Sequence, residues 1–153
     1  MPKAKETALT ALNLDDSLAD AHTSLAFVEM HFEWKFREAE REFKRAIDLD
    51  PNCSIAHQWY AFDLAAMGRL DEAVAEVKRA RQTDPFSAIV NTDVAEILYF
   101  DRNYDEALRQ ARATVGNGSK LCARAPRNGA HLRREAHVSR GHCRREAGGG
   151  ALW

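Results

Sequence analysis

A period of 34 residues is the feature that most restricts how this sequence can fold. Pro51 and Pro85 lie 34 positions apart, and aligning the chain on them places AEREFKRAIDLDP (39–51) over AVAEVKRARQTDP (73–85). Self-similarity at such a spacing is typical of repeat proteins, in which each unit buries its apolar face against its neighbours. We therefore expect a stack of similar units.

The repeated segment has the spacing of one helix face. In each copy an alanine is followed four positions later by an apolar residue, and three positions after that by another alanine. Alanine favours the helix and lets a neighbouring backbone approach closely, so the pattern predicts tightly packed helix pairs. The two copies are Ala39, Phe43 and Ala46, and Ala73, Val77 and Ala80.

A further helix is predicted ahead of each such segment, over residues 20–30, 55–67 and 89–100. Gly68 can adopt positive φ at the end of the second of these helices, and Asp71 then favours the start of the next one through its dipole. Proline disfavours the helical conformation of the residue before it, so each Asp-Pro pair ends a unit. The unit is a helix-turn-helix.

These residues resemble the tetratricopeptide repeat, a family with a period of 34 and the pattern W-x2-L-G-x2-Y, A-x3-F, P. The resemblance implies an all-α fold, an α-α superhelix of antiparallel helix pairs. The middle repeat carries His57, Tyr60, Ala61, Leu64, Ala73, Val77 and Pro85. The first carries His22, Leu25, Ala26, Glu29, Ala39, Phe43 and Pro51, with one extra residue in its HFEWKF turn. The third carries Asn91, Val94, Ala95, Leu98, Ala107 and Ala111, with Ser119 where proline is expected.

The resemblance covers residues 3–115 and predicts three repeats plus a half-repeat. The half-repeat, residues 3–16, is the second helix of a truncated unit, because Ala4, Ala8 and Ala11 repeat the alanine spacing. The full repeats are expected at about 17–51, 52–85 and 86–115, followed by a tail over 116–153.

Residues 57–93 also resemble the repeat region of bacterial multidomain transcriptional regulators and serine/threonine kinases. That likeness implies a scaffold that binds proteins, cut from a larger signalling or transcriptional regulator. No stretch approaches the ~18 apolar residues of a membrane helix, and the first twenty residues lack a secretion signal. With three widely spaced cysteines, which do not suggest a disulfide framework, the expected location is the cytoplasm, away from membranes.

The formal charge of −1 hides an asymmetry, because residues 1–115 sum to −7 and residues 116–153 to +6. The tail also holds seven of the eight glycines. Three interpretations stay open: a disordered basic tail that binds nucleic acid or acidic partners, a metal-binding segment, and out-of-frame translation of GC-rich DNA, which we favour. The metal hypothesis would use Cys122, His131, His137, His142 and Cys143.

No catalytic, cofactor-binding or metal site is predicted. The sequence has no glycine-rich phosphate loop, no His-Glu-x-x-His stretch and no ordered Ser-His-Asp set. We expect neither enzyme activity nor a cofactor. His22 and His57 occupy equivalent positions of two repeats, which indicates packing between helices.

The resemblance implies that the first helix of each repeat lines a concave groove that binds a peptide or protein segment of unknown identity. The alternative is that Phe27, Ile55, Phe62 and Ile89 simply pack between repeats. The Lys, Asn and Arg side chains with which some members clamp a C-terminal carboxylate are absent from this face. The candidate residues at helical spacing are Asp20, Thr23, Phe27, Met30, Ile55, Gln58, Phe62, Ala65, Ile89, Thr92, Glu96 and Tyr99.

Two other functions compete with peptide binding. A nucleic-acid-associated protein would use the basic tail, and its binding would depend strongly on salt. A structural protein would self-associate through open repeat ends, where Leu9 and Leu12 are expected to be partly uncovered.

Overall fold

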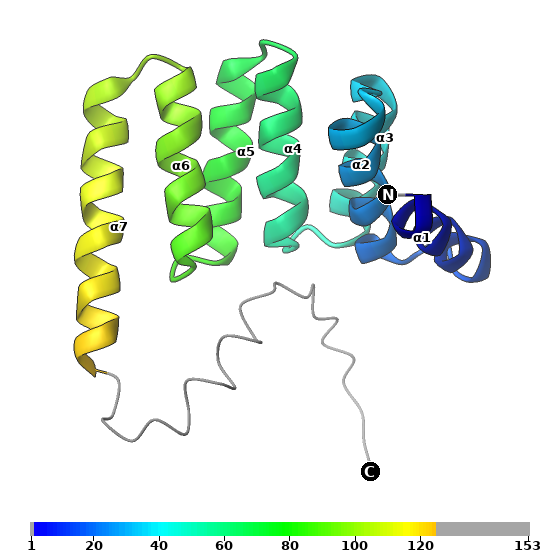
Figure 1. Ribbon diagram of the computed structural model, residues 1–153, viewed down its shortest axis with the longest axis horizontal. Coiled ribbons are helices and arrows are strands. Elements are labelled where there is room, and N and C mark those ends of the chain that lie inside the picture. Colours follow the sequence, from blue (N-terminus) through cyan, green and yellow to red (C-terminus); the bar gives the residue numbers. More distant parts are fainter. Residues whose placement is uncertain (1, 125–153) are drawn as a thin grey trace.

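The computed structural model describes residues 2–124, with side chains over residues 3–116. Seven helices and no strands make up this part of the chain, which confirms the all-α expectation (Figure 1). The hypotheses about nucleic acid, metal and reading frame concern a tail whose side chains lie outside the described residues. The helices are α1 (Pro2–Leu14), α2 (Ala19–Glu33), α3 (Phe36–Leu49), α4 (Ser54–Ala66), α5 (Leu70–Thr83), α6 (Ala88–Phe100) and α7 (Tyr104–Arg124).

Three antiparallel hairpins, α2–α3, α4–α5 and α6–α7, form the body of the molecule (Figure 1). Each hairpin turns at one residue in the left-handed region: Trp34 with φ 56°, Gly68 with φ 77° and Arg102 with φ 60°. The three turns lie at intervals of 34 residues. The same backbone solution therefore recurs in every repeat, although only the middle one uses glycine.

Each turn is closed by the backbone N–H that follows the left-handed residue. Arg69 N donates to Leu64 O at 2.9 Å and Asn103 N donates to Leu98 O at 3.0 Å, both reaching five residues back. In the first hairpin Lys35 N donates to Glu29 O at 3.0 Å, six residues back. The extra residue of the first repeat is thus accommodated in the last turn of α2.

The core is one continuous cluster that runs through the three hairpins from α2 to α7. The alanine–apolar–alanine sets of α3 and α5 are fully buried, and Phe43 and Val77 are both 0% exposed. Small alanines let the helices approach closely, while the larger side chain fills the space behind them. Complete burial of a side chain such as Phe43 stabilises the fold by about 1.5–3 kcal/mol.

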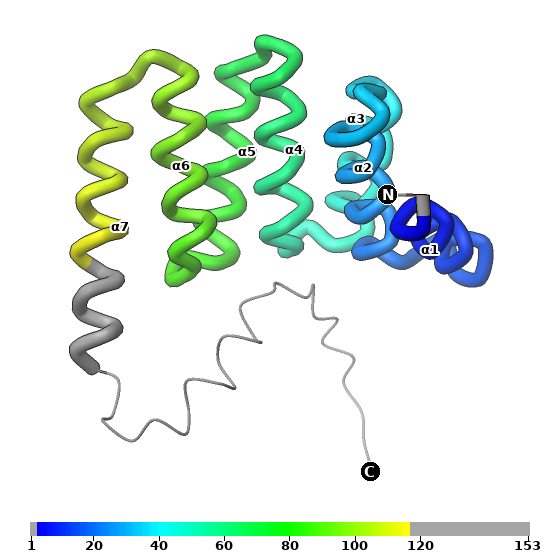
Figure 2. The backbone as a smooth tube through the Cα atoms, in the orientation of Figure 1, coloured from blue at the N-terminus to red at the C-terminus, as the bar shows by residue number. Residues whose placement is uncertain are grey.

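The helices form two rows: α2, α4 and α6 form the inner row, and α1, α3, α5 and α7 form the outer row. The rows differ in how closely the backbones of neighbouring helices approach. In the inner row α2 packs against α4 and α4 packs against α6, whereas the backbones of α3 and α5 stay apart, as do those of α5 and α7. Successive hairpins lie side by side (Figure 2) and pack mainly through α3 against α4 and α5 against α6, with the inner-row contacts in addition.

Helix α7 continues to Arg124, beyond residue 115 where the third repeat is predicted to end. Gly116 and Gly118 lie inside this helix. Helix α1 packs against α2 and occupies the position that α3 and α5 hold in the later repeats.

Candidate functional site

The structure places the twelve predicted peptide-binding residues at different depths of the inner row. Thr23, Met30 and Gln58 are buried, Phe27, Ile55, Phe62 and Ala65 are half-buried, and Asp20, Ile89, Thr92, Glu96 and Tyr99 are at least partly exposed. Thr23 Oγ1 donates to Ala19 O at 2.8 Å within its own helix, and Met30 belongs to the core. Those two residues therefore contribute to packing.

An aromatic pair bridges the first two helices of the inner row. The rings of Phe27 in α2 and Trp59 in α4 lie with centroids 4.2 Å apart and planes inclined by 38°. The ring of His31 also packs against Phe27, with the two centroids 4.1 Å apart. Both Phe27 and Trp59 are half-buried, so each ring packs at the junction of two repeats and still presents part of its surface to solvent.

A second aromatic group lies at the end of the inner row. Tyr99 is 60% exposed, and its ring centroid lies 6.2 Å from that of Phe100 and 5.5 Å from that of Tyr104. Ile89, at the beginning of the same helix, is also exposed. The two ends of α6 thus add apolar surface to the row that begins at Phe27.

A hydrogen bond joins the second and third helices of the inner row, because Gln58 Nε2 donates to Asp93 Oδ2. Burial raises the pKa of Asp93 to about 6, against the opposing effect of that hydrogen bond. Sequence reasoning missed Trp59, Asp93 and His31. Trp59 and Asp93 directly follow the chosen residues Gln58 and Thr92, so a wider helical face would have included both.

The two repeat-equivalent histidines connect the rows. His22 Nδ1 lies 2.6 Å from Glu42 Oε2 and its Nε2 lies 2.9 Å from Asp16 O. His57 makes the equivalent pair of contacts in the second repeat, with a glutamate of α5 and a carbonyl of the preceding loop. These rings therefore hold a helix pair and the preceding loop together, as the repeat pattern predicts for packing residues.

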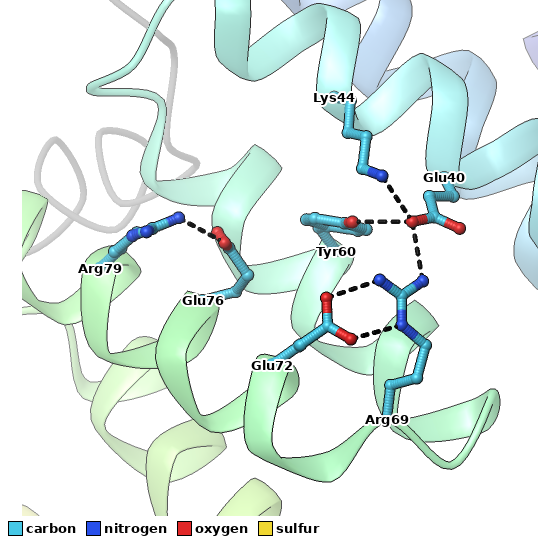
Figure 3. A network of polar contacts seen from close by, with 7 residues as sticks. All are labelled: Glu40, Lys44, Tyr60, Arg69, Glu72, Glu76 and Arg79. Atoms are coloured by element: carbon cyan, nitrogen blue, oxygen red, sulfur yellow. Dashed lines mark hydrogen bonds and ion pairs between the residues drawn. The ribbon is translucent and has the colours of Figure 1, made fainter.

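A polar network connects the first repeat to the second (Figure 3). Glu40 Oε1 accepts hydrogen bonds from Lys44 Nζ at 2.7 Å, Arg69 Nη1 at 2.7 Å and Tyr60 Oη at 3.0 Å. The Arg69 guanidinium also binds both carboxylate oxygens of Glu72 at 2.6 Å. Burial favours the neutral form of Glu40, but the three donors outweigh it and lower its pKa to about 2.

Asp63 in α4 is the most unusual polar residue of the core. It is 0% exposed, and neither carboxylate oxygen has a hydrogen-bond partner among the described residues. Burial, followed by the charge of Glu40, raises its pKa to about 7, although Arg69 acts in the opposite direction. The equivalent positions of the neighbouring repeats hold Val28 and Ile97, which are both buried.

The described part of the chain has no group of three His, Cys, Asp or Glu side chains arranged to hold a metal ion. Within the same residues, none of the helices combines the length and the apolar character that crossing a bilayer requires.

Comparison with known proteins identifies the repeat. Residues 34–92 match the family model described as tetratricopeptide repeat. No curated protein sequence matches the chain.

Solved structures support the same architecture. Two crystal structures of MamA are 18% identical to the chain, with TM-scores of 0.68 and 0.69; they cover 78% and 82% of it, and 69% and 68% of their own chains. A thermophilic tetratricopeptide repeat protein from Thermus thermophilus is 20% identical with a TM-score of 0.66, covering 88% of this chain and 70% of its own. At these identities the likeness establishes the fold.

Proposed function

We propose that this tetratricopeptide-repeat solenoid is a protein-interaction module whose inner row binds a peptide or a protein segment. The observation that carries the proposal is the series of apolar side chains along that row that keep part of their surface in solvent: Phe27, Trp59, Phe62, Ile89 and Tyr99. Large aromatic side chains of this kind supply much of the binding energy of protein interfaces. Among the described residues, no group of side chains is comparably arranged for catalysis.

The geometry suits a segment lying across the helices. The Phe27–Trp59 pair sits where two repeats meet, and Gln58 and Asp93 connect the next two helices of the same row. A peptide that runs along the row from α2 to α6 would therefore contact the apolar Phe27–Trp59 pair and then the polar Gln58–Asp93 pair. Peptide-binding surfaces commonly combine apolar contacts with hydrogen-bonding groups in this way.

The setting of the module is a further part of the proposal. Residues 57–93 resemble the repeat region of bacterial transcriptional regulators and serine/threonine kinases, so we assign the module to a cytoplasmic signalling or transcriptional regulator. A binding role without enzymatic activity is part of the same proposal and rests on analogy with the repeat family.

Selection from a random peptide display library tests the peptide-binding proposal. The library is panned on the full chain, and enriched peptides are then measured on Trp59→Ala and on Trp34→Ala. Trp34 is a matched control because it is 74% exposed and lies in the α2–α3 turn. We expect Trp59→Ala to weaken binding by roughly tenfold or more and Trp34→Ala to leave it unchanged. Enrichment of no peptide, or equal losses in both variants, would contradict the proposal.

Self-association is a second candidate, favoured by one observation. A groove of about 620 Å³ between α1 and α2 is lined by three apolar side chains, Leu9, Val28 and Phe32, among polar and charged ones. Leu9 is 42% exposed and Phe32 is 49% exposed. Size-exclusion chromatography with light scattering would reveal dimers that Leu9→Glu disrupts, whereas a monomer at every concentration would exclude this role.

A further inference from the structure

The helices of the inner row carry acidic side chains but no lysine or arginine. Helices α2, α4 and α6 contain neither basic residue, whereas α3 and α5 of the outer row carry seven: Arg37, Arg41, Lys44, Arg45, Lys78, Arg79 and Arg81. The inner-row acids are Asp20, Glu29, Glu33, Asp63, Asp93 and Glu96. The basic side chains of these five helices therefore all lie on the outer row.

Two of these carboxylates are placed to meet a partner. Glu96 and Asp93 are both partly exposed and lie one turn apart on α6. Neither forms an ion pair with any lysine or arginine whose side chain the structure describes. Asp93 has given up part of its hydration and receives a hydrogen bond from the neutral Gln58 amide, so its charge is left uncompensated.

Helix α4 links the aromatic pair to Asp93. Trp59 directly follows Gln58, the residue that holds Asp93, and its ring contacts Phe27. The faces of tryptophan and phenylalanine attract ammonium and guanidinium groups as well as apolar side chains. The inner row thus combines negative charge with exposed π surface.

We propose that the segment bound by the inner row is a basic, apolar peptide of a partner protein, whose arginine or lysine side chains pair with Asp93 and Glu96 while apolar side chains cover the Phe27–Trp59 pair. This inference rests on the proposed peptide-binding function and adds the chemistry of the partner. Acidic peptides and nucleic-acid phosphates are repelled by the same carboxylates.

Two synthetic peptides of equal length provide the test. In one, leucine and tryptophan alternate with arginine, and in the other they alternate with glutamate. Their binding to the full chain is measured by fluorescence anisotropy at low and high NaCl. We expect the arginine peptide to bind, its affinity to fall as salt rises, and the glutamate peptide to show no binding.

Matched charge variants locate the interaction. Asp93→Asn with Glu96→Gln removes two negative charges from the inner row, and Glu38→Gln with Asp48→Asn removes two from α3 in the outer row. We expect roughly tenfold weaker binding for the first pair and a change within about twofold for the second. Glu96→Gln alone leaves the Gln58–Asp93 hydrogen bond intact, so it keeps the test valid if the double variant unfolds.

The outcomes separate this inference from the general function. If both peptides bind equally and Trp59→Ala abolishes both, the inner row binds peptides but the basic partner is wrong. If neither peptide binds and the display library yields nothing, both proposals fail. If the arginine peptide binds only after Arg133, Arg134, Arg144 and Arg145 are replaced by glutamine, the chain's own basic tail is the occupant and the partner segment is overturned.

Discussion

His57 Nδ1 lies 2.7 Å from Glu76 Oε2 in a buried contact that joins α4 to α5, while His57 Nε2 lies 3.0 Å from Pro51 O. Thirty-four residues later Asn91 Nδ2 donates to Pro85 O at 2.9 Å, and Gln110 Nε2 donates to Asn91 Oδ1 at 2.9 Å. The third repeat thus reproduces the contact with neutral amides. The position requires a side chain that binds the preceding loop and the facing helix together.

Removal of one member of this buried pair is expected to destabilise the protein. Glu76→Ala leaves a ring nitrogen of His57 without its partner, which should cost about 1–3 kcal/mol in the free energy of unfolding. The double variant His57→Asn with Glu76→Gln installs the amide pair of the third repeat and should recover part of that loss. Urea unfolding followed by circular dichroism measures both, and a double variant less stable than Glu76→Ala would contradict the equivalence.

The buried Asp63 makes stability depend on pH in an unusual direction. Its pKa is raised from 3.8 to about 7 in the folded state, so folding favours the protonated form. The contribution is present in full below about pH 4 and is lost as pH rises through about 7. Asp63→Asn cannot ionise and should be more stable than the wild type at pH 8 by about 1–3 kcal/mol.

Thermal unfolding at several pH values checks the Asp63 prediction. The gain from Asp63→Asn should shrink steadily between pH 8 and pH 5. Asp48→Asn, at an exposed position of α3, is the control and should show no such trend. A constant difference between Asp63→Asn and the wild type at every pH would show that Asp63 does not titrate in this range.

The contribution of Glu40 to stability should depend on pH in the opposite direction to that of Asp63. Its pKa is lowered from 4.5 to about 2 by three hydrogen-bond donors, so its stabilising contribution is present above about pH 4.5 and is lost as pH falls toward 2. Glu40→Gln should therefore lower the free energy of unfolding by about 1 kcal/mol at pH 7 and have a smaller effect at pH 3. Urea titrations at the two pH values make the comparison, and equal losses at both would contradict it.

Substitutions at two of the left-handed turn residues are expected to change the stability in opposite directions. A Cβ at Gly68 would meet nothing within 4 Å, so Gly68→Ala should lose only about 1 kcal/mol, from the strained φ of 77°. Arg102 holds the equivalent conformation with a side chain, and Arg102→Gly should stabilise by about 0.5 kcal/mol. Thermal melts of the two variants test the pair, and a stabilised Gly68→Ala would show that the turn has changed conformation.

The sequence alone was enough to predict the helical hairpins. The alanine spacing around Phe43 and Val77 and the period between Pro51 and Pro85 are local properties, because helix formation and turn geometry depend on residues within a few positions of one another. The same holds for the paired positions of His22 and His57. The matched family model and the α-helical stack agree with that prediction.

Only the tertiary structure decided which side chains of the inner row remain available. Thr23 and Met30 share the predicted helical spacing with Phe27, yet both are buried, while Trp59 and Asp93 lie at the junctions of the row. The depth of a side chain depends on how far each hairpin rotates against the next, and that rotation is set by packing between residues distant in sequence. The unpartnered burial of Asp63, in a position where the other described repeats carry Val28 and Ile97, has the same origin.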